Sequence, residues 1–130
     1  MKALANKIGP LRKVIEEQKG PLALYAMVLP EDAIAWDMLV AATWIDKDQS
    51  DALKYLVKQV QSVLTKQELL NLSGILLFDT DKLAEYGVSV DSETGWEENN
   101  IEFYGRRVQK AYIFVGPLVG LNLSKYKVND

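Results

Sequence analysis

The segment Trp36-Asp37-Met38-Leu39-Val40-Ala41-Ala42-Thr43-Trp44-Ile45 decides the predicted fold. Every second residue from Trp36 to Trp44 is apolar, whereas the alternate set from Asp37 to Ile45 is mixed. A period of two with one wholly apolar face is typical of a β-strand that is fully buried on that face. We therefore predict that residues 36–45 form a strand whose two indoles point into a shared interior, and that the rest of the chain covers this strand.

Length and composition indicate an ordinary globular domain. The chain has 130 residues, of which 48% are hydrophobic and 25% charged, and this suits one domain with one core. We predict a single domain over residues 1–130, with residues 1–9 as a loose lead-in and residues 118–130 as a C-terminal tail. No apolar run is long enough to span a membrane and the N-terminus lacks the apolar core of a secretory signal, so a cytoplasmic location is expected.

Two residue types are absent, and their absence excludes several chemistries. The chain has no cysteine and no histidine. Disulfides, thiolate nucleophiles, zinc–thiolate sites, imidazole bases and Ser-His-Asp triads are therefore excluded. Catalysis would depend on carboxylates, lysine, tyrosine, serine or threonine. We predict no metal site and no cofactor.

Proline and glycine delimit the elements before the central strand. Pro10 and Gly20 frame a predicted helix, because proline suits the first helical turn and glycine the position after the last one. The apolar run 22–29 predicts a buried strand. A turn at residues 30–33 would return this strand antiparallel into the central one.

Helical periodicity follows the central strand. Apolar residues spaced three and four apart from Leu53 to Leu64 predict a helix capped by Asp48 or Ser50. The sequence Thr65-Lys66-Gln67-Glu68 matches a capping box and predicts a short second helix. Further short elements are predicted as a strand at 74–78, a helix at 82–86 capped by Asp79-Thr80-Asp81, and a brief strand at 88–90 in an otherwise irregular polar segment.

The last predicted element is a hairpin with arms at 101–104 and 108–115. Gly105-Arg106 between them suits a type II′ turn, whose first central residue has positive φ. Together these elements predict an α+β two-layer sandwich, with a mostly antiparallel sheet of about five strands and helices on one face. A right-handed parallel crossover from the central strand through the long helix into strand 74–78 would make the sheet mixed.

Three tryptophans and one aspartate are candidate binding residues. Trp36 and Trp44 would line a pocket or a dimer interface if helices leave their face uncovered. Trp96 lies in a polar segment, where it either contacts a partner or folds back on the sheet. Asp37 stands beside Trp36 at the start of the strand, but it lacks an identifiable carboxylate partner for catalysis.

Basic side chains at the hairpin tip complete the candidate set. Arg106 and Arg107 would reach a phosphate group, but the chain lacks a basic face, and this argues against nucleic-acid binding. Charge is segregated along the chain: residues 2–19 and 106–127 are net basic, whereas eight carboxylates between residues 79 and 102 stand against Lys82 alone. The pattern predicts faces that pair with each other, and the alternative is an acidic surface for a basic partner.

Two separated motifs carry a resemblance to a known group of proteins. The motifs are Trp36-Asp37-x-x-Val40-x-Ala42-x-Trp44 and, after the amphipathic helix, Gly105-Arg106-Arg107-Val108-x-x-Ala111-Tyr112-Ile113-Phe114. This arrangement resembles small bacterial proteins that carry a Trp-Asp-Leu-x-Val-Ser-Ala-x-Trp strand, and the likeness covers residues 22–115. The resemblance implies a bacterial origin and a compact α+β domain, but no activity and no functional residue.

Three functional hypotheses follow. The first is a non-catalytic binding protein that forms a homodimer or binds a protein partner, and a small-molecule ligand is compatible with it. The second is a small hydrolase or isomerase that uses carboxylates and tyrosine, which requires two carboxylates to converge on a pocket. The third is an acidic immunity- or decoy-type protein that binds a basic partner. A monomer whose tryptophan face is sealed and which has no cleft would argue against the dimer, whereas a cleft lined by Asp37 and another carboxylate would favour the enzyme.

Overall fold

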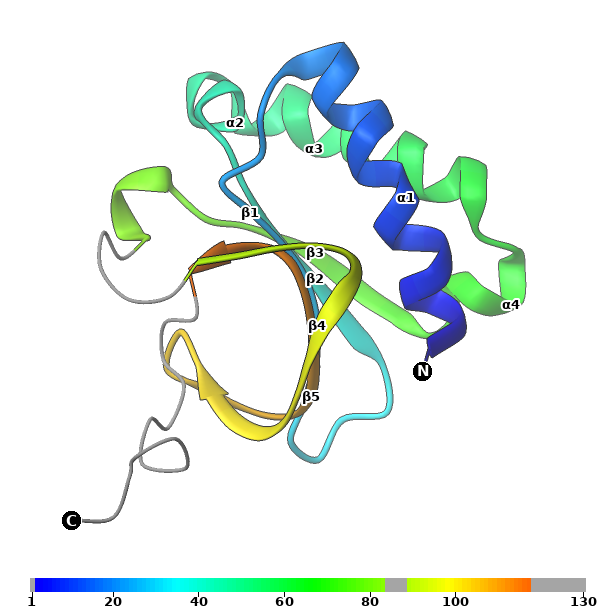
Figure 1. The fold of residues 1–130 in the computed structure, drawn as a ribbon. Helices are drawn as coiled ribbons and strands as arrows, with labels where there is room; N and C mark the ends of the chain where they lie inside the picture. The colour runs from blue at the N-terminus through cyan, green and yellow to red at the C-terminus, as the bar shows by residue number, and fades with distance from the viewer. Residues whose placement is uncertain (1, 84–88, 118–130) are drawn as a thin grey trace, which may run out of the picture.

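The computed structural model describes residues 2–83 and 89–117 (Figure 1). The five strands form one sheet in the order β3-β2-β1-β5-β4. Strands β2 and β3 are parallel and all other pairs are antiparallel. This confirms the predicted α+β class with a mixed, mostly antiparallel sheet. The elements are α1 (Lys2–Lys19), β1 (Leu24–Pro30), β2 (Trp36–Ala41), α2 (Thr43–Lys47), α3 (Gln49–Val63), α4 (Lys66–Leu69), β3 (Leu72–Leu77), the 3-10 turn η1 (Thr80–Lys82), β4 (Ser89–Phe103) and β5 (Arg106–Pro117).

Two hydrophobic cores lie on opposite faces of the sheet. Helices α1 and α3 cover one face, as Figure 1 shows, and Trp36, Met38 and Val40 of β2 point into this helix-side core. On the opposite face the long strands β4 and β5 curl round, and Leu39 and Ala41 point into the second core inside this curl. Both faces of β2 are therefore buried, whereas the sequence predicted one fully and one partly buried face.

The first helix begins at Lys2 and runs through Pro10, so the predicted lead-in over residues 1–9 is wrong for the described part of that range. Leu4, Ala5 and Ile8 are buried in the helix-side core together with later residues of the same helix. A proline inside a helix costs about 3 kcal/mol through its missing N–H and its ring. Burial of these apolar side chains by the first two turns offsets this cost.

The central strand ends at Ala41, so Trp44 lies on helix α2 and not on the predicted strand. The partner strand β1 is paired only as far as Leu24 opposite Ala41, and no strand remains to continue the ladder. The N–H groups of Ile45 and Asp46 then donate to the Ala42 carbonyl oxygen and form a helical turn.

Strand β4 spans the polar segment that was predicted to be irregular beyond residue 90. Most of its polar side chains are exposed, whereas its apolar residues Val90, Ile101 and Phe103 are buried in the second core. The register shifts between Asp91 and Trp96 relative to β5, and Gly95 there has φ 95°. Irregularities of this kind bend a strand and help the sheet to curl.

The turn between β4 and β5 is centred on Tyr104 and Gly105, one residue before the predicted Gly105-Arg106. Phe103 pairs with Arg106 across the hairpin, and the two central residues have φ 52° and 76°. Positive φ at both positions defines a type I′ turn, one of the two turn types whose twist matches that of the flanking strands.

The two helix caps predicted in the middle of the chain are confirmed. The side chain of Asp48 accepts from the Asp51 N–H at the start of α3, and Thr65 and Glu68 form the reciprocal capping box of α4. Near residue 80 the structure has only η1, and most of the predicted helix 82–86 lies outside the described residues, as does the predicted tail 118–130. No described helix is long and apolar enough to cross a membrane.

Two glycines that differ in backbone conformation give a stability prediction. Gly105→Ala is expected to lower the free energy of unfolding by about 1–2 kcal/mol, because φ 76° places Cβ in the unfavourable left-handed region. Gly74→Ala serves as the control, since a Cβ there meets no atom within 4 Å, and its effect is expected to be neutral or stabilising by up to about 1 kcal/mol. Urea titrations of the two variants measure the difference, and equal stabilities would contradict the assigned turn.

Candidate interaction surface

The tryptophan face is sealed. Trp36 is 3% exposed and stacks on Tyr112 with ring centroids 5.5 Å apart. Trp44 packs edge-on against Tyr55 of α3 at 6.0 Å, at the margin of the same core. Both indoles therefore do reach one interior, although from a strand and a helix. Helices α1 and α3 cover Trp36, so among the described residues its indole lines no open pocket, and Trp44 remains partly buried at the margin.

Asp37 and Arg106, two of the candidate residues, are brought together by the sheet. The guanidinium of Arg106 at the start of β5 donates to Asp37 Oδ2 at 3.0 Å, across the intervening strand β1. The Asp37 side chain is 12% exposed and that of Arg106 37%. Two residues before Arg106, burial raises the pKa of the Tyr104 hydroxyl to about 12. The ion pair neutralises the one buried carboxylate that the sequence offered as a catalytic group.

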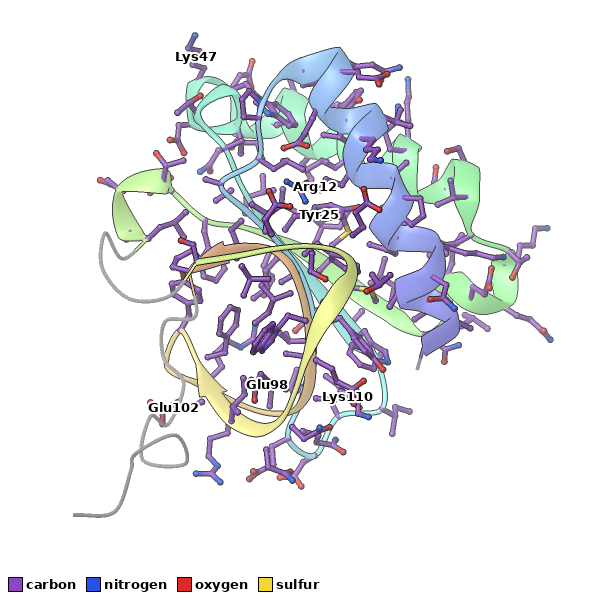
Figure 2. The ribbon with its side chains drawn as sticks, viewed as in Figure 1. Arg12, Tyr25, Lys47, Glu98, Glu102 and Lys110 are labelled. Carbon is purple, nitrogen blue, oxygen red and sulfur yellow. The ribbon has the colours of Figure 1, made fainter. Side chains whose placement is uncertain are left out.

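Arg107 and Trp96, the other two candidates, lie apart from this pair. Arg107 forms an exposed ion pair with Glu31 at 3.1 Å. Trp96 is 45% exposed, and its indole N–H donates to the buried carboxylate of Glu98 at 2.7 Å. Figure 2 shows Glu98 inside the curl of β4 and β5, whereas Lys47 projects outward from α2. The six predicted residues thus do not form one site.

Three of the eight carboxylates in the acidic segment form ion pairs with the two basic segments, which confirms part of the pairing that the charge pattern predicted. Arg12 of α1 donates to Asp91 at 2.7 Å, and Lys13 lies 3.1 Å from Glu93. The hydrogen bond from Arg12 lowers the pKa of Asp91. Lys110 of β5 pairs with Glu97 at 3.1 Å.

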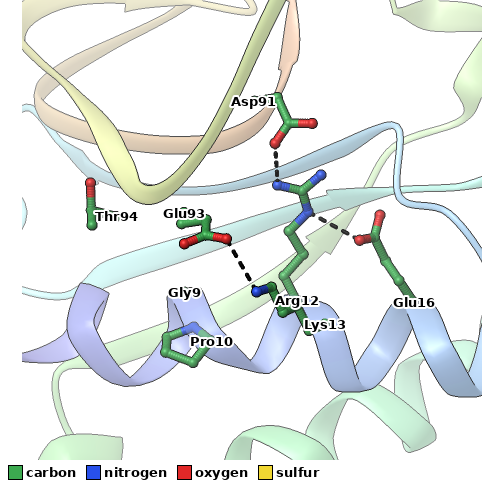
Figure 3. Close-up of a pocket in the computed structure, with 8 residues that line it drawn as sticks. All are labelled: Gly9, Pro10, Arg12, Lys13, Glu16, Asp91, Glu93 and Thr94. Atoms are coloured by element: carbon green, nitrogen blue, oxygen red, sulfur yellow. Dashed lines mark hydrogen bonds and ion pairs between the residues drawn. The ribbon is translucent and has the colours of Figure 1, made fainter.

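The Arg12–Asp91 and Lys13–Glu93 ion pairs frame a pocket of about 430 Å³ between α1 and β4, which Figure 3 shows in close-up. Arg12 also bonds Glu16 within the same helix at 3.2 Å, so two of its five N–H donors are used inside the protein (Figure 3). The Arg12 side chain is only 16% exposed, and both cations are already paired with carboxylates of the chain. The pocket is therefore better explained as the contact between α1 and the curled strand than as a binding site.

A second pocket, of about 300 Å³, is apolar and lies where α3 and α4 meet the edge strand β3. We call it the edge groove. Leu53 and Val57 of α3 line it, and each is 38% exposed although both are large and apolar. The other residues that line the edge groove are Val60, Gln61, Leu69, Leu72, Gly74 and Ile75.

No family model, curated protein or solved structure matches this chain. The resemblance to small bacterial proteins accordingly stays a prediction, and the fold and the surface carry the functional argument alone.

Strand β3 beside the edge groove is an unprotected sheet edge. Among the described residues it pairs with β2 only. The Phe78 N–H, which follows the strand, donates to the Val40 carbonyl oxygen of β2 at 2.9 Å. Since peptide groups alternate in direction along a strand, those of Ile75 and Leu77 point to the open side. This edge therefore presents unsatisfied backbone groups next to apolar side chains.

The apolar spacing along α3 is a sequence signal for the edge groove, although it was interpreted as core packing alone. Leu53, Leu56, Val57, Val60 and Leu64 were all predicted to face the core. The structure buries Leu56, Val60 and Leu64 but leaves Leu53 and Val57 half-buried. An apolar stripe wider than the face that the sheet can cover indicates a second contact. Within residues 2–83 and 89–117, no group of three metal-ligating side chains accompanies it.

Proposed function

We propose that this protein is a non-catalytic interaction protein that binds an extended segment of a partner protein along β3. The open peptide groups of β3 would hydrogen-bond the added strand, and alternate apolar side chains of that strand would enter the edge groove. This mode of recognition takes affinity from main-chain hydrogen bonds and specificity from neighbouring side-chain pockets. The observation that carries the proposal is an uncharged apolar edge strand that lies directly beside an apolar groove.

The two edges of the sheet differ in a way that supports this assignment. Natural proteins protect sheet edges with charged side chains, bulges or proline. Strand β4, at one edge, carries five carboxylates and an irregular register. Strand β3, at the other edge, has the sequence Leu-Ser-Gly-Ile-Leu-Leu, without a charge or a proline. Its one register shift lies at the start of the strand, between Leu72 and Gly74. The rest of this edge, without charge or proline, is suited to pairing.

The two alternative functions have less support. A carboxylate enzyme would need free acidic groups in a cleft, but Asp37 is held by Arg106 and Glu98 accepts from Trp96. An acidic decoy would need an open acidic surface, but Asp91, Glu93 and Glu97 are paired within the chain. Arg106 and Arg107 are also ion-paired, so nucleic acid remains a disfavoured partner. The cytoplasmic location remains a prediction.

Polar substitution of the edge groove tests the proposed function. The probe is a fluorescein-labelled synthetic peptide with the sequence of residues 71–79, which can add to β3 as a strand. In the double variant Leu53→Gln/Val57→Gln we expect at least tenfold weaker peptide binding by fluorescence anisotropy. The reason is that each tenfold step corresponds to about 1.4 kcal/mol, and two apolar side chains that become buried on binding contribute about this much.

The matched control is Val14→Gln on α1. Val14 is 40% exposed, close to the exposure of Leu53 and Val57, but lies outside the edge groove. Its peptide affinity is expected to stay within twofold of the unsubstituted protein. The proposed function would be refuted if the peptide does not bind detectably, or if the control weakens its binding equally. In either case the Leu53→Gln/Val57→Gln variant would also have to self-associate as strongly as the unsubstituted protein.

A further inference from the structure

We infer that the segment bound along β3 is the β3 strand of a second copy of this chain, placed antiparallel about a two-fold axis that passes beside Ile75, so that Ile75 of one copy lies opposite Ile75 of the other. This inference rests on the proposed function and names its partner. It follows from the charges that flank the edge groove, which differ at its two ends.

The end of the edge groove where β3 finishes is acidic. Hydrogen bonds hold the connection after β3 against α2 and α3: Gln49 donates to Asp79 at 2.9 Å and the Thr80 hydroxyl to Asp46 at 2.6 Å. These contacts place the start of α3 beside the end of β3. Among residues 2–83 and 89–117, five carboxylates belong to this end against three lysines: Asp46, Asp48, Asp51, Asp79 and Asp81 against Lys47, Lys54 and Lys82.

The opposite end, where β3 begins, is basic. Helix α4 leads directly into β3, and Lys7 of α1 is bound to its Glu68 at 2.7 Å. Lys66 of α4 is exposed, and so is Lys58 in the second half of α3. Three lysines therefore stand against one carboxylate at this end.

A second copy placed antiparallel complements the difference in charge between the two ends of the edge groove, whereas a parallel copy does not. Antiparallel pairing of β3 with its symmetry mate brings the acidic end of each copy to the basic end of the other, twice in one interface. The strand has no charged side chain, so its self-pairing creates no like-charge contact. Leu53 and Val57 of the two α3 helices would be covered together. An interface of this kind is isologous and closes as a dimer.

Charge reversal at each end tests the inference on the full chain. The basic-end variant is Lys58→Glu/Lys66→Glu and the acidic-end variant is Asp51→Lys/Asp81→Lys, all at exposed positions. We expect the unsubstituted protein to sediment as a dimer at micromolar concentration, and each variant alone to dimerise at least tenfold more weakly. An equimolar mixture of the two variants should recover the dimer mass, because both junctions of the heterodimer again join opposite charges.

The outcomes separate this inference from the proposed function. If the protein is monomeric but binds the 71–79 peptide through Leu53 and Val57, the second copy is refuted and the proposed function stands. If the dimer is insensitive to charge reversal, or the mixture of variants fails to recover it, the antiparallel arrangement is refuted. If the Leu53→Gln/Val57→Gln variant dimerises and binds the peptide with the same affinities as the unsubstituted protein, both the second copy and the proposed function are refuted.

Discussion

The Trp36→Ala variant is expected to lose about 3–5 kcal/mol of unfolding free energy, the range measured for removal of a large buried aromatic side chain. Trp36 is 3% exposed and stacks on Tyr112 of β5 at 5.5 Å. These two rings connect the β2 side of the sheet to the β5 side over the intervening β1. Loss of the Trp36 indole leaves a cavity beside Tyr112 in the helix-side core. Helices α1 and α3, which cover this face, can only partly close it.

Urea denaturation followed by circular dichroism measures this loss independently of tryptophan fluorescence. Ile34→Ala is the control, because Ile34 lies just before β2 but is 96% exposed, and its effect should stay within about 0.5 kcal/mol. A loss below about 1 kcal/mol for Trp36→Ala would mean that the indole is not part of the core. The tryptophan face would then again be a candidate interface.

Arg106→Ala is expected to cost about 2–3 kcal/mol, because it leaves the Asp37 carboxylate largely buried without its partner. Removal of both side chains should cost less than the sum of the two single alanine substitutions. The double-mutant cycle measures this difference directly. Through its ion pair with Arg106, Asp37 would hold β2 and β5 in register across β1.

The neighbouring pair provides the control for this cycle. Arg107→Ala removes an ion pair whose side chains are 70% and 52% exposed, and solvent screening limits its effect to less than about 1 kcal/mol. Additive effects of the Asp37 and Arg106 substitutions would contradict the assigned ion pair. They would also make Asp37 a free carboxylate and so revive the enzymatic hypothesis.

Local sequence patterns were sufficient where the determinant was itself local. The alternation from Trp36 to Val40 placed β2, the spacing from Leu53 to Leu64 placed α3, and Thr65 with Glu68 placed the cap of α4. Each of these signals depends on residues a few positions apart, so a single sequence is enough to recognise it.

The failures have a common cause, which is that tertiary contacts decided the outcome. Pro10 signals the start of a helix, but burial of the preceding turn against the sheet carries α1 through it. Trp44 continues the strand alternation, but the chain leaves the sheet where its partner strand β1 begins. The polar β4 reads as a loop until β5 is present to pair with it.

The candidate surface could not have been predicted from local patterns, because it depends on strand order. Leu53 and Val57 become half-exposed only because β3 is the last strand on their side and leaves part of α3 uncovered. Sequence reasoning chose tryptophans and arginines, the residue types enriched in interfaces. In this fold those side chains are mostly used for internal stacking and ion pairs.

Hydrogen exchange at the β3 edge tests the central claim most directly. The amides of Ile75 and Leu77 point away from β2, the only strand that pairs with β3 in the described part of the chain. We predict that their exchange slows by at least tenfold when the protein concentration rises from well below to well above its dimerisation midpoint, while the amide of exposed Gly105, in the β4–β5 turn at the opposite edge of the sheet, exchanges at an unchanged rate. Equal exchange of Ile75 and Leu77 at both concentrations, with the protein sedimenting as a dimer at the higher one, would contradict the account.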